Sequence, residues 1–528
     1  MAPALVAIKR GSFQVQRAAK VVNANLIKFM TALIFDIQFK IYLRNIKGYK
    51  FYNILSEYIG SQQLICIFVI TGFVLCGIVE QSASVALRAN GTSAYSAAEF
   101  AEYVENTSYI KRYCLPLPET NETTVHIARS IPHIEIPMTR TDKTESVLRE
   151  AFMWGTLISP LAASRIAARV GAERLFGAGV FGAGVSAVMV PAAWLTPYHV
   201  AIRIVQGIFM GATWPAAHML AVTWFKPKNL SAFVSTYTAV NLGYAVVGLL
   251  GTILVRSLGR DWLSYTITVI SCLWYFLWWR FVEETLNPNR PIRDEHRLLP
   301  WRRLLLSKPA WACGIAVVGS QWADATLMLG VTKYLKLVYG FSVAYEDVLA
   351  SLPHVGHFFA AITFGILVDH VRESGIVSTT TARKLFVYIS HFLPAALLFV
   401  LGYTGCDPAA PAALYTAALA LTGATPAGAF ASAADIAPNF AGTVFGLCQT
   451  IGAAGLLAAN YVVSEGLHGS FAGWWRLVFG VSSAVLLTTA TFFMAIGSGS
   501  IQDWNAPCDF ELEKEQVEEP SRLESVLE

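Results

Sequence analysis

Charge is scarce in this sequence. Asp, Glu, Lys and Arg make up only 14% of its 528 residues, 55% are hydrophobic, and the mean hydropathy is positive. Soluble domains carry about 25% charged residues, so this composition excludes a soluble protein. The sequence also lacks a G-x-x-x-x-G-K-[ST] phosphate loop, which excludes an ATP-driven pump of that type. Neither His-Glu-x-x-His nor paired Cys-x-x-Cys occurs, so we predict no metal site, no cofactor and no enzymatic activity.

Long apolar stretches are what the sequence has instead. About 20 mostly apolar residues span a bilayer as a helix, and twelve stretches approach or exceed that length. They lie at 63–87, 145–167, 171–194, 198–221, 230–255, 261–283, 308–332, 346–371, 383–404, 411–433, 440–465 and 474–498. We therefore predict an all-α, multi-pass membrane protein with twelve transmembrane helices.

The basic residues predict the orientation, because Lys and Arg accumulate in cytoplasmic loops. Residues 1–62 contain nine Lys or Arg against two acids, and residues 284–307 add five arginines. Both termini are therefore predicted to be cytoplasmic, and the basic residues follow topology rather than a nucleic-acid surface. The sequence does not distinguish a plasma membrane from an endolysosomal or vesicle membrane.

The loop 88–144 is consequently predicted to lie outside. It contains three N-x-[ST] glycosylation motifs, at Asn90, Asn106 and Asn121, and we expect all three to be glycosylated.

The charged segment 284–307 divides the helices into two sets of six. The predicted parts are a basic segment 1–62, a first half 63–283, the linker 284–307, a second half 308–498 and an acidic tail 499–528. Two such halves can rock about a central site and expose it to each side in turn. We expect a monomer in the lipid bilayer.

One apolar stretch, Arg203–His218, keeps a cation at one end and an imidazole at the other. A helix turns about 100° per residue, which places Arg203, Gly207, Met210, Trp214 and His218 in one stripe. An arginine facing lipid costs at least about 2.5 kcal/mol, so the stripe faces protein or water. Arg203 then either lies in a central cavity or extends to the membrane interface.

Several short motifs are familiar in their order and spacing. They are Phe152-Met-Trp-Gly155, Gln206-Gly207, Pro215-Ala-Ala-His218, Leu352-Pro353, the segment 378–386, Asp435-Ile-Ala-Pro438 with Ala441-Gly442, and the segment 497–504. Over residues 63–504 the chain resembles the major facilitator superfamily, and within it the anion:cation symporters of solute carrier family 17. That group includes sialin, the vesicular glutamate transporters and the sodium/phosphate cotransporters.

The resemblance implies movement of a small organic or inorganic anion, such as a phosphate or carboxylate, coupled to H⁺ or Na⁺. It implies that Arg203 and His218 match the family's helix 4 arginine and histidine. The chain departs from the family pattern at four places: Glu80 replaces a helix 1 arginine, Met210 a helix 4 glutamate, Ala325 a helix 7 aromatic residue, and Ser432-Ala433 an Asn-His pair.

Glu80 has two interpretations. It could form an ion pair with Arg203 across the cavity, which would close the site to anions. Alternatively it replaces the missing helix 4 glutamate as the coupling carboxylate, since burial raises the pKa of a carboxyl group toward neutrality. Its protonation would then free Arg203 for the anion.

The remaining candidates lie on three other helices. Asp324 is a coupling carboxylate or a partner in a structural hydrogen bond, and His218 is a coupling group or a hydrogen-bond partner for a neighbouring helix. Gln321 and Trp322 are candidate substrate-binding residues, although an aromatic side chain in a bundle also serves plain packing. Arg149, near the outer mouth, could attract and bind an anion.

Three functions remain open from the sequence. The first is secondary active transport of a small anion, driven by protons or sodium. The second keeps the fold but takes a cationic or neutral polar solute, because Glu80 and Asp324 are both acidic. The third is a receptor-like relative that transports nothing. A cavity faced by Glu80 and Asp324 but not by Arg203 would argue against an anion.

Overall fold

The computed structural model describes residues 61–91, 140–194, 197–283, 300–339, 343–404, 409–465 and 471–505. The chain divides into two compact units, 1–64 and 65–528, and everything below concerns the second. The predicted segment 1–62, loop 88–144, linker 284–307 and tail 499–528 lie wholly or largely outside the described residues. Within the described part every regular element is helical.

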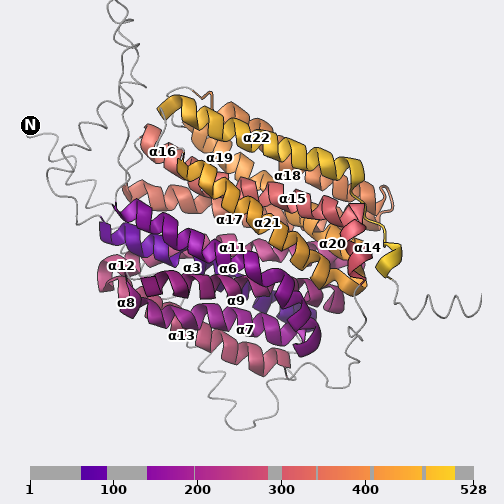
Figure 1. Ribbon diagram of the computed structural model, residues 1–528, viewed down its shortest axis with the longest axis horizontal. Helices are drawn as coiled ribbons and strands as arrows, with labels where there is room; N and C mark the ends of the chain where they lie inside the picture. The colour runs from indigo at the N-terminus through magenta and orange to yellow at the C-terminus, as the bar shows by residue number, and fades with distance from the viewer. Residues whose placement is uncertain are drawn as a thin grey trace, which may run out of the picture. The chain divides into compact units, whose positions relative to one another are not determined.

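The first six helical segments form what we call the first half (Figure 1). They are α3 (Ser61–Gly91), α6 (Arg140–Val170), α7 (Ala172–Val185) with η1 (Ser186–Met189) and α8 (Val190–Ala193), α9 (Pro197–Trp224), α10 (Leu230–Ser235) through η3 (Thr236–Thr238), α11 (Ala239–Val246) and η4 (Val247–Gly251) to α12 (Thr252–Leu258), and α13 (Arg260–Trp278) with η5 (Trp279–Glu283).

The next six segments form the second half. They are α15 (Lys308–Ala325) with η6 (Thr326–Val331) and α16 (Thr332–Tyr339), preceded by the short α14 (Trp301–Leu306), then α17 (Val343–Glu373), α18 (Thr379–Leu401), α19 (Ala409–Thr422) with η7 (Pro426–Phe430) and α20 (Ala431–Ile436), α21 (Ala441–Glu465), and α22 (Phe471–Ile496). All twelve predicted apolar stretches are therefore helical.

Most of these segments can cross a membrane. Among the described residues, ten are long and apolar enough by length and composition. The other two, α6 and α13 with η5, are less apolar: α6 contains Arg165 and Pro160 within its apolar part, and α13 is rich in Trp and Tyr. Large apolar side chains on α13, such as Val269, Leu273 and Phe276, are more than half exposed, as expected of a surface that faces lipid.

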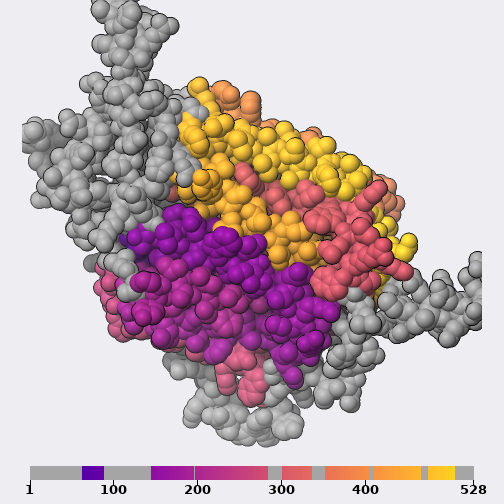
Figure 2. Space-filling view, in the orientation of Figure 1, coloured from indigo at the N-terminus to yellow at the C-terminus, as the bar shows by residue number. Residues whose placement is uncertain are grey.

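The two halves meet along a seam, visible in Figure 2 where purple atoms adjoin orange ones. Helix α21 packs on α6 and α9, and α17 packs on α10 and α11. Glycines permit this approach: a Cβ on Gly446 would lie 2.8 Å from the carbonyl oxygen of Pro160, and one on Gly442 would lie 2.3 Å from the Met219 side chain. Small residues are the usual means by which membrane helices pack closely.

Several helices contain π-helical turns. They occur in the segments that contain α11, α13, α15 and α19, as η4, η5, η6 and η7. Such turns widen a helix locally and are frequent at functional sites. Two of them, η6 and η7, contribute residues to the cavity described next.

Candidate functional site

A cavity of about 140 Å³ lies between the two halves. Its lining comes from α3, α6, α9, η3 and α11 of the first half, and from α15, η6, α17, α19, η7 and α21 of the second. Among the described helices, α7, α13, α18 and α22 contribute no lining residue. A site built from both halves changes its exposure whenever one half moves against the other.

Two carboxylates face this cavity, one from each half. Glu80 projects from α3 and accepts a 2.6 Å hydrogen bond from the Tyr244 hydroxyl of α11. Asp324 projects from α15, and no hydrogen bond or ion pair joins its side chain to another described residue. Within the described chain neither carboxylate has a Lys, Arg or His nitrogen within ion-pair distance.

Tyr244 links Glu80 to the second half. Its ring packs edge-on against His354 of α17, with centroids 5.6 Å apart. His354 Nδ1 lies 2.9 Å from Oδ1 of Asn241 on α11, and because an amide oxygen only accepts, that nitrogen donates. Tyr244 therefore connects the Glu80 carboxylate directly to a contact between the two halves.

Of the basic residues that the structure describes, Arg149 of α6 is the one that lines the cavity. It forms an ion pair with Glu145, one helical turn earlier, and also donates to the Ser84 hydroxyl at 3.2 Å. The positive charge of Arg149 is thus largely balanced by a carboxylate that does not line the cavity.

Neutral polar groups complete the lining on the second half. The Gln321 amide donates to the Gln449 amide oxygen of α21 at 3.3 Å. His357 Nδ1 lies 2.8 Å from the Leu419 carbonyl oxygen. Because a carbonyl only accepts, Nδ1 carries the proton and Nε2 is an acceptor in the neutral ring.

Aromatic residues from both halves form one end of the cavity. Trp214 and Tyr237 line it from the first half and Phe430 from the second, with Trp214 6.1 Å from Tyr237 and 6.3 Å from Phe430 between ring centroids. Phe445 lies behind Phe430 at 5.2 Å. This layer separates the cavity from the end of the bundle where α9 ends and α10 begins.

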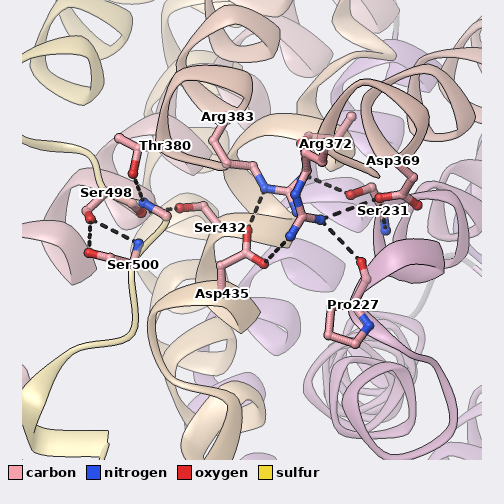
Figure 3. Close-up of polar contacts among 12 residues, drawn as sticks. Pro227, Ser231, Asp369, Arg372, Thr380, Arg383, Ser432, Asp435, Ser498 and Ser500 are labelled. Atoms are coloured by element: carbon pink, nitrogen blue, oxygen red, sulfur yellow. Dashed lines mark hydrogen bonds and ion pairs between the residues drawn. The ribbon is translucent and has the colours of Figure 1, made fainter. Parts of the chain in front are cut away.

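A buried charge network ties the halves together at that same end (Figure 3). We call Ser231, Asp369, Arg372, Arg383 and Asp435 the latch, and this end of the bundle the latch end. Asp369 of α17 accepts backbone N–H bonds from Ser231 at 3.3 Å and from the next residue at 2.9 Å. A carboxylate in this place stabilises the N-terminus of the helix that begins with α10.

Two arginines complete the latch. Arg383, fully buried, donates to Asp435 at 2.6 Å and to the Ser231 hydroxyl at 2.7 Å. Arg372 lies 3.6 Å from Asp369 and 3.5 Å from Asp435, and donates to the Pro227 carbonyl at 3.3 Å. Because residues 227 and 231 belong to the first half and the charged side chains to the second, the latch holds this end closed.

The terminal motif 497–504 packs on the latch end as well. The Gly499 N–H donates to the Thr380 hydroxyl at 3.0 Å, and Ser432 donates to the Ser498 carbonyl at 2.9 Å. A Cβ on Gly499 would lie 2.9 Å from the Thr379 side chain, so the close approach requires glycine.

Comparison with known proteins identifies the family to which the chain belongs. A model described as the Major Facilitator Superfamily matches residues 148–460, more than half of the chain. The chain belongs to the Major Facilitator Superfamily. It is accordingly a multi-pass membrane transporter and not an enzyme, as the sequence predicts.

Its relatives within the superfamily are distant. Human sialin is 26% identical over 381 residues, which cover 69% of this chain and 77% of sialin. Human vesicular glutamate transporter 2 is 26% identical over 417 residues, covering 75% of this chain and 72% of that protein. The predicted resemblance to the superfamily, with distant homology to sialin and the vesicular glutamate transporters, is confirmed.

Solved structures of other members share the fold. The proton:xylose symporter XylE superposes with a TM-score of 0.56 at 13% identity, covering 84% of this chain and 97% of that one. The human organic anion transporter MFSD10 gives a TM-score of 0.56 at 14% identity, covering 82% and 99%. The predicted all-α facilitator fold is therefore confirmed, and the superfamily's fold implies twelve transmembrane helices.

In this facilitator, four predicted site residues come together around one cavity. Glu80, Asp324, Gln321 and Arg149 all line it. Helix periodicity separates Gln321 from its neighbour Trp322, which points toward α22 and donates to the Ser482 hydroxyl at 3.0 Å. Trp322 thus packs against another helix and is not part of the lining.

Arg203 does not reach the cavity surface, and only 2% of it is exposed. Its guanidinium donates to the carbonyl oxygens of Val79 at 3.0 Å and Glu80 at 2.6 Å, and to the Gln206 amide oxygen at 2.8 Å. It also lies over the Phe152 ring at 4.6 Å. Arg203 therefore holds the backbone of α3, and the hypothesised ion pair with the Glu80 carboxylate does not form.

His218 is also fully buried outside the cavity. Its ring stacks on Phe445 of α21 with centroids 4.1 Å apart. Neither ring nitrogen has a hydrogen-bond partner among the described residues. The residue thus joins the halves by packing, and its predicted coupling role remains a prediction.

The glycosylation predictions fall at the edge of the described chain or beyond it. Asn90 lies in the last turn of α3, and Asn106 and Asn121 lie outside the described residues. The sequence did not indicate that Tyr244 and Gln449 line the cavity, or that Asp369 joins the two halves in the latch. Tyr244 and Gln449 are uncharged, and nothing in their local sequence marks them.

Proposed function

We propose that the protein is a proton-coupled secondary transporter in which Glu80 and Asp324 carry the coupling protons. The observation that carries this proposal is the pair of carboxylates, without a cationic partner among the described residues, in a cavity built from both halves. Ionisable groups are costly inside a membrane and usually mark proton or substrate pathways.

Alternating access follows from the latch. With the latch closed, solute and protons reach the cavity from the opposite end, between α6, α21 and their neighbours. Opening the latch separates α10 from α17, and the bound solute and protons then leave the cavity toward the latch end. The basic residues of 1–62 and 284–307 favour a cytoplasmic latch end, since α3 and α15 both begin there.

The coupling ion is better matched by H⁺ than by Na⁺. A proton needs a single carboxylate, whereas a metal cation needs several oxygen ligands arranged around it. No group of three or more His, Cys, Asp or Glu side chains suited to a metal ion occurs among the described residues. A bound proton also removes a charge from the cavity before the halves move.

The predicted cargo, a phosphate or carboxylate, has support from the relatives and not from the cavity. Vesicular glutamate transporter 2 carries glutamate by its name, and MFSD10 is titled an organic anion transporter. An anion needs a fixed positive field in its site. Here Arg203 is engaged with backbone oxygens, Arg149 pairs with Glu145, and two carboxylates face the space.

The proposal is tested with the full chain in proteoliposomes. Uptake of phosphate, glutamate, sialic acid and a quaternary ammonium ion is measured under imposed pH, sodium and voltage gradients. We expect uptake of at least one solute to depend on the pH gradient and to lose that dependence in Glu80→Gln. Glu373→Gln is the matched control, because Glu373 is an exposed acid paired with Lys228 at the latch end.

Two results would overturn the proposal. One is no uptake of any solute under any gradient by protein that is monodisperse in detergent, which would favour a receptor-like relative. The other is uptake whose pH dependence is the same in the wild type and in Glu80→Gln.

A further inference from the structure

The charge on the cavity surface does not suit the anions after which the relatives are named. Glu80 and Asp324 contribute two carboxylates, and among the described residues the only other fully charged side chain in the lining is Arg149, which Glu145 balances. The Arg203 guanidinium is withdrawn behind α3 and Phe152. With both carboxylates ionised, an anion entering this space would meet two negative groups, whereas Arg149 is already paired with Glu145, so the net interaction is repulsive.

We propose that the cavity binds a small organic cation, an amine whose ammonium group pairs with Glu80 and Asp324 and whose apolar body contacts the aromatic lining. This inference rests on the proposed transport function and names its substrate class. An ammonium group supplies the positive charge that both carboxylates lack among the described residues.

The aromatic lining fits the rest of such a molecule. Phe152, Trp214, Tyr237, Tyr244 and Phe430 surround the space on several sides. The faces of such rings attract ammonium groups, and their bodies bury an apolar substituent. A cavity of similar size, about 150 Å³, holds benzene in another protein, so 140 Å³ suits an amine with one ring.

Charge balance then makes the exchange an antiport. With cation bound, Glu80 and Asp324 are ionised and the ammonium neutralises one of their two charges. When the cation leaves, one proton from the side facing the cavity replaces it on the carboxylates, so the net charge of the pair is unchanged. The ionisable groups around Glu80 on the packed helices are Cys76 of its own helix, Arg149 of α6, Arg203 of α9, Tyr244 of α11, Asp324 of α15, and His354 and His357 of α17.

The binding test compares two ligands that differ in the sign of one group. Phenylethylamine and phenylacetate are titrated into the purified full chain near neutral pH by calorimetry. We expect the amine to bind at least tenfold more tightly than phenylacetate, and its affinity to fall at least tenfold in Glu80→Gln and in Asp324→Asn. Glu373→Gln keeps the wild-type affinity. Two results with the wild type alone would overturn the inference. One is binding of phenylacetate or glutamate as tight as that of the amine, and the other is no binding of the amine.

The transport test uses phenyltrimethylammonium, which cannot lose its charge and so does not cross the bilayer unaided. We expect proteoliposomes with an acidic interior to accumulate it, and an ionophore that collapses the pH gradient to abolish the accumulation. Uptake of an anion but not of this cation, with pH dependence lost in Glu80→Gln, would overturn the inference and leave the proposed function standing. If monodisperse wild-type protein transports none of the solutes, both the inference and the proposed function are overturned.

Discussion

Removing the charge of Asp369 tests whether the latch holds one end of the bundle closed. Its carboxylate accepts the N–H groups of Ser231 and Ala232 and lies 3.6 Å from Arg372. In Asp369→Asn the amide oxygen still accepts, but each bond loses about 1 kcal/mol relative to a charged acceptor. The helix-terminus interaction, worth up to about 2 kcal/mol when partly buried, overlaps with these bonds. A net loss of about 2 kcal/mol shifts the closed-to-open ratio about 30-fold.

The assay measures how fast a buried thiol is modified. Ser164 of α6 is 1% exposed and adjoins Gly446 of α21 across the seam, so Ser164→Cys reports opening of the latch end. In a chain whose eight native cysteines are replaced, we expect Asp369→Asn to raise the rate of modification by a maleimide by up to about 30-fold.

The control is a nearby acid outside the latch. Glu373 pairs with Lys228 at 3.6 Å, but both side chains are more than half exposed, and such pairs contribute about 0 to 1 kcal/mol. Glu373→Gln should therefore leave the rate within a few-fold of the parent. An unchanged rate in Asp369→Asn, or an equal rise in the control, would refute the role assigned to the latch.

Three other substitutions have defined outcomes. Tyr244→Phe removes the hydroxyl that orients Glu80, and the loss of about 1 kcal/mol should weaken phenylethylamine binding about fivefold by calorimetry. Arg203→Lys keeps a charge but replaces two guanidinium nitrogens with one ammonium, which does not span the same acceptors on α3 and at Gln206. We therefore expect about 2 kcal/mol of destabilisation in thermal unfolding and unchanged ligand selectivity. A switch in selectivity with no change in stability would contradict this. Gly446→Val forces the halves apart and should speed thiol modification at the latch end, whereas Gly480→Ala, which meets no atom within 4 Å, should not.

The helices could be predicted because hydropathy alone specifies them. The predicted stretches fall short of many helix ends by up to a turn or more. Helix α6, for example, begins at Arg140 and not at 145. Hydropathy reports the part of a helix that lies in lipid, whereas backbone hydrogen bonding continues into polar residues beyond it.

Part of the site was also accessible from the sequence. Glu80 and Asp324 stand out as acids within apolar stretches, and such residues rarely face lipid. Arg203 does lie on a helix, α9, but a single sequence does not specify the rotation of one helix against its neighbours. That rotation turns the guanidinium toward the α3 backbone and away from the cavity. Trp322 and Gln321 illustrate the same limit, since one residue step changes the helix that a side chain faces.

The burial of the latch has a consequence for ionic strength. Mobile ions screen charges in solvent over about 8 Å at 0.15 M salt, but they reach buried pairs poorly. Arg383 is fully buried and Asp435 and Asp369 are each 7% exposed, whereas the neighbouring Lys228–Glu373 pair is open to solvent. Salt should therefore weaken the surface pair and spare the latch. The free energy that holds this end closed should therefore change little between compartments of different salinity.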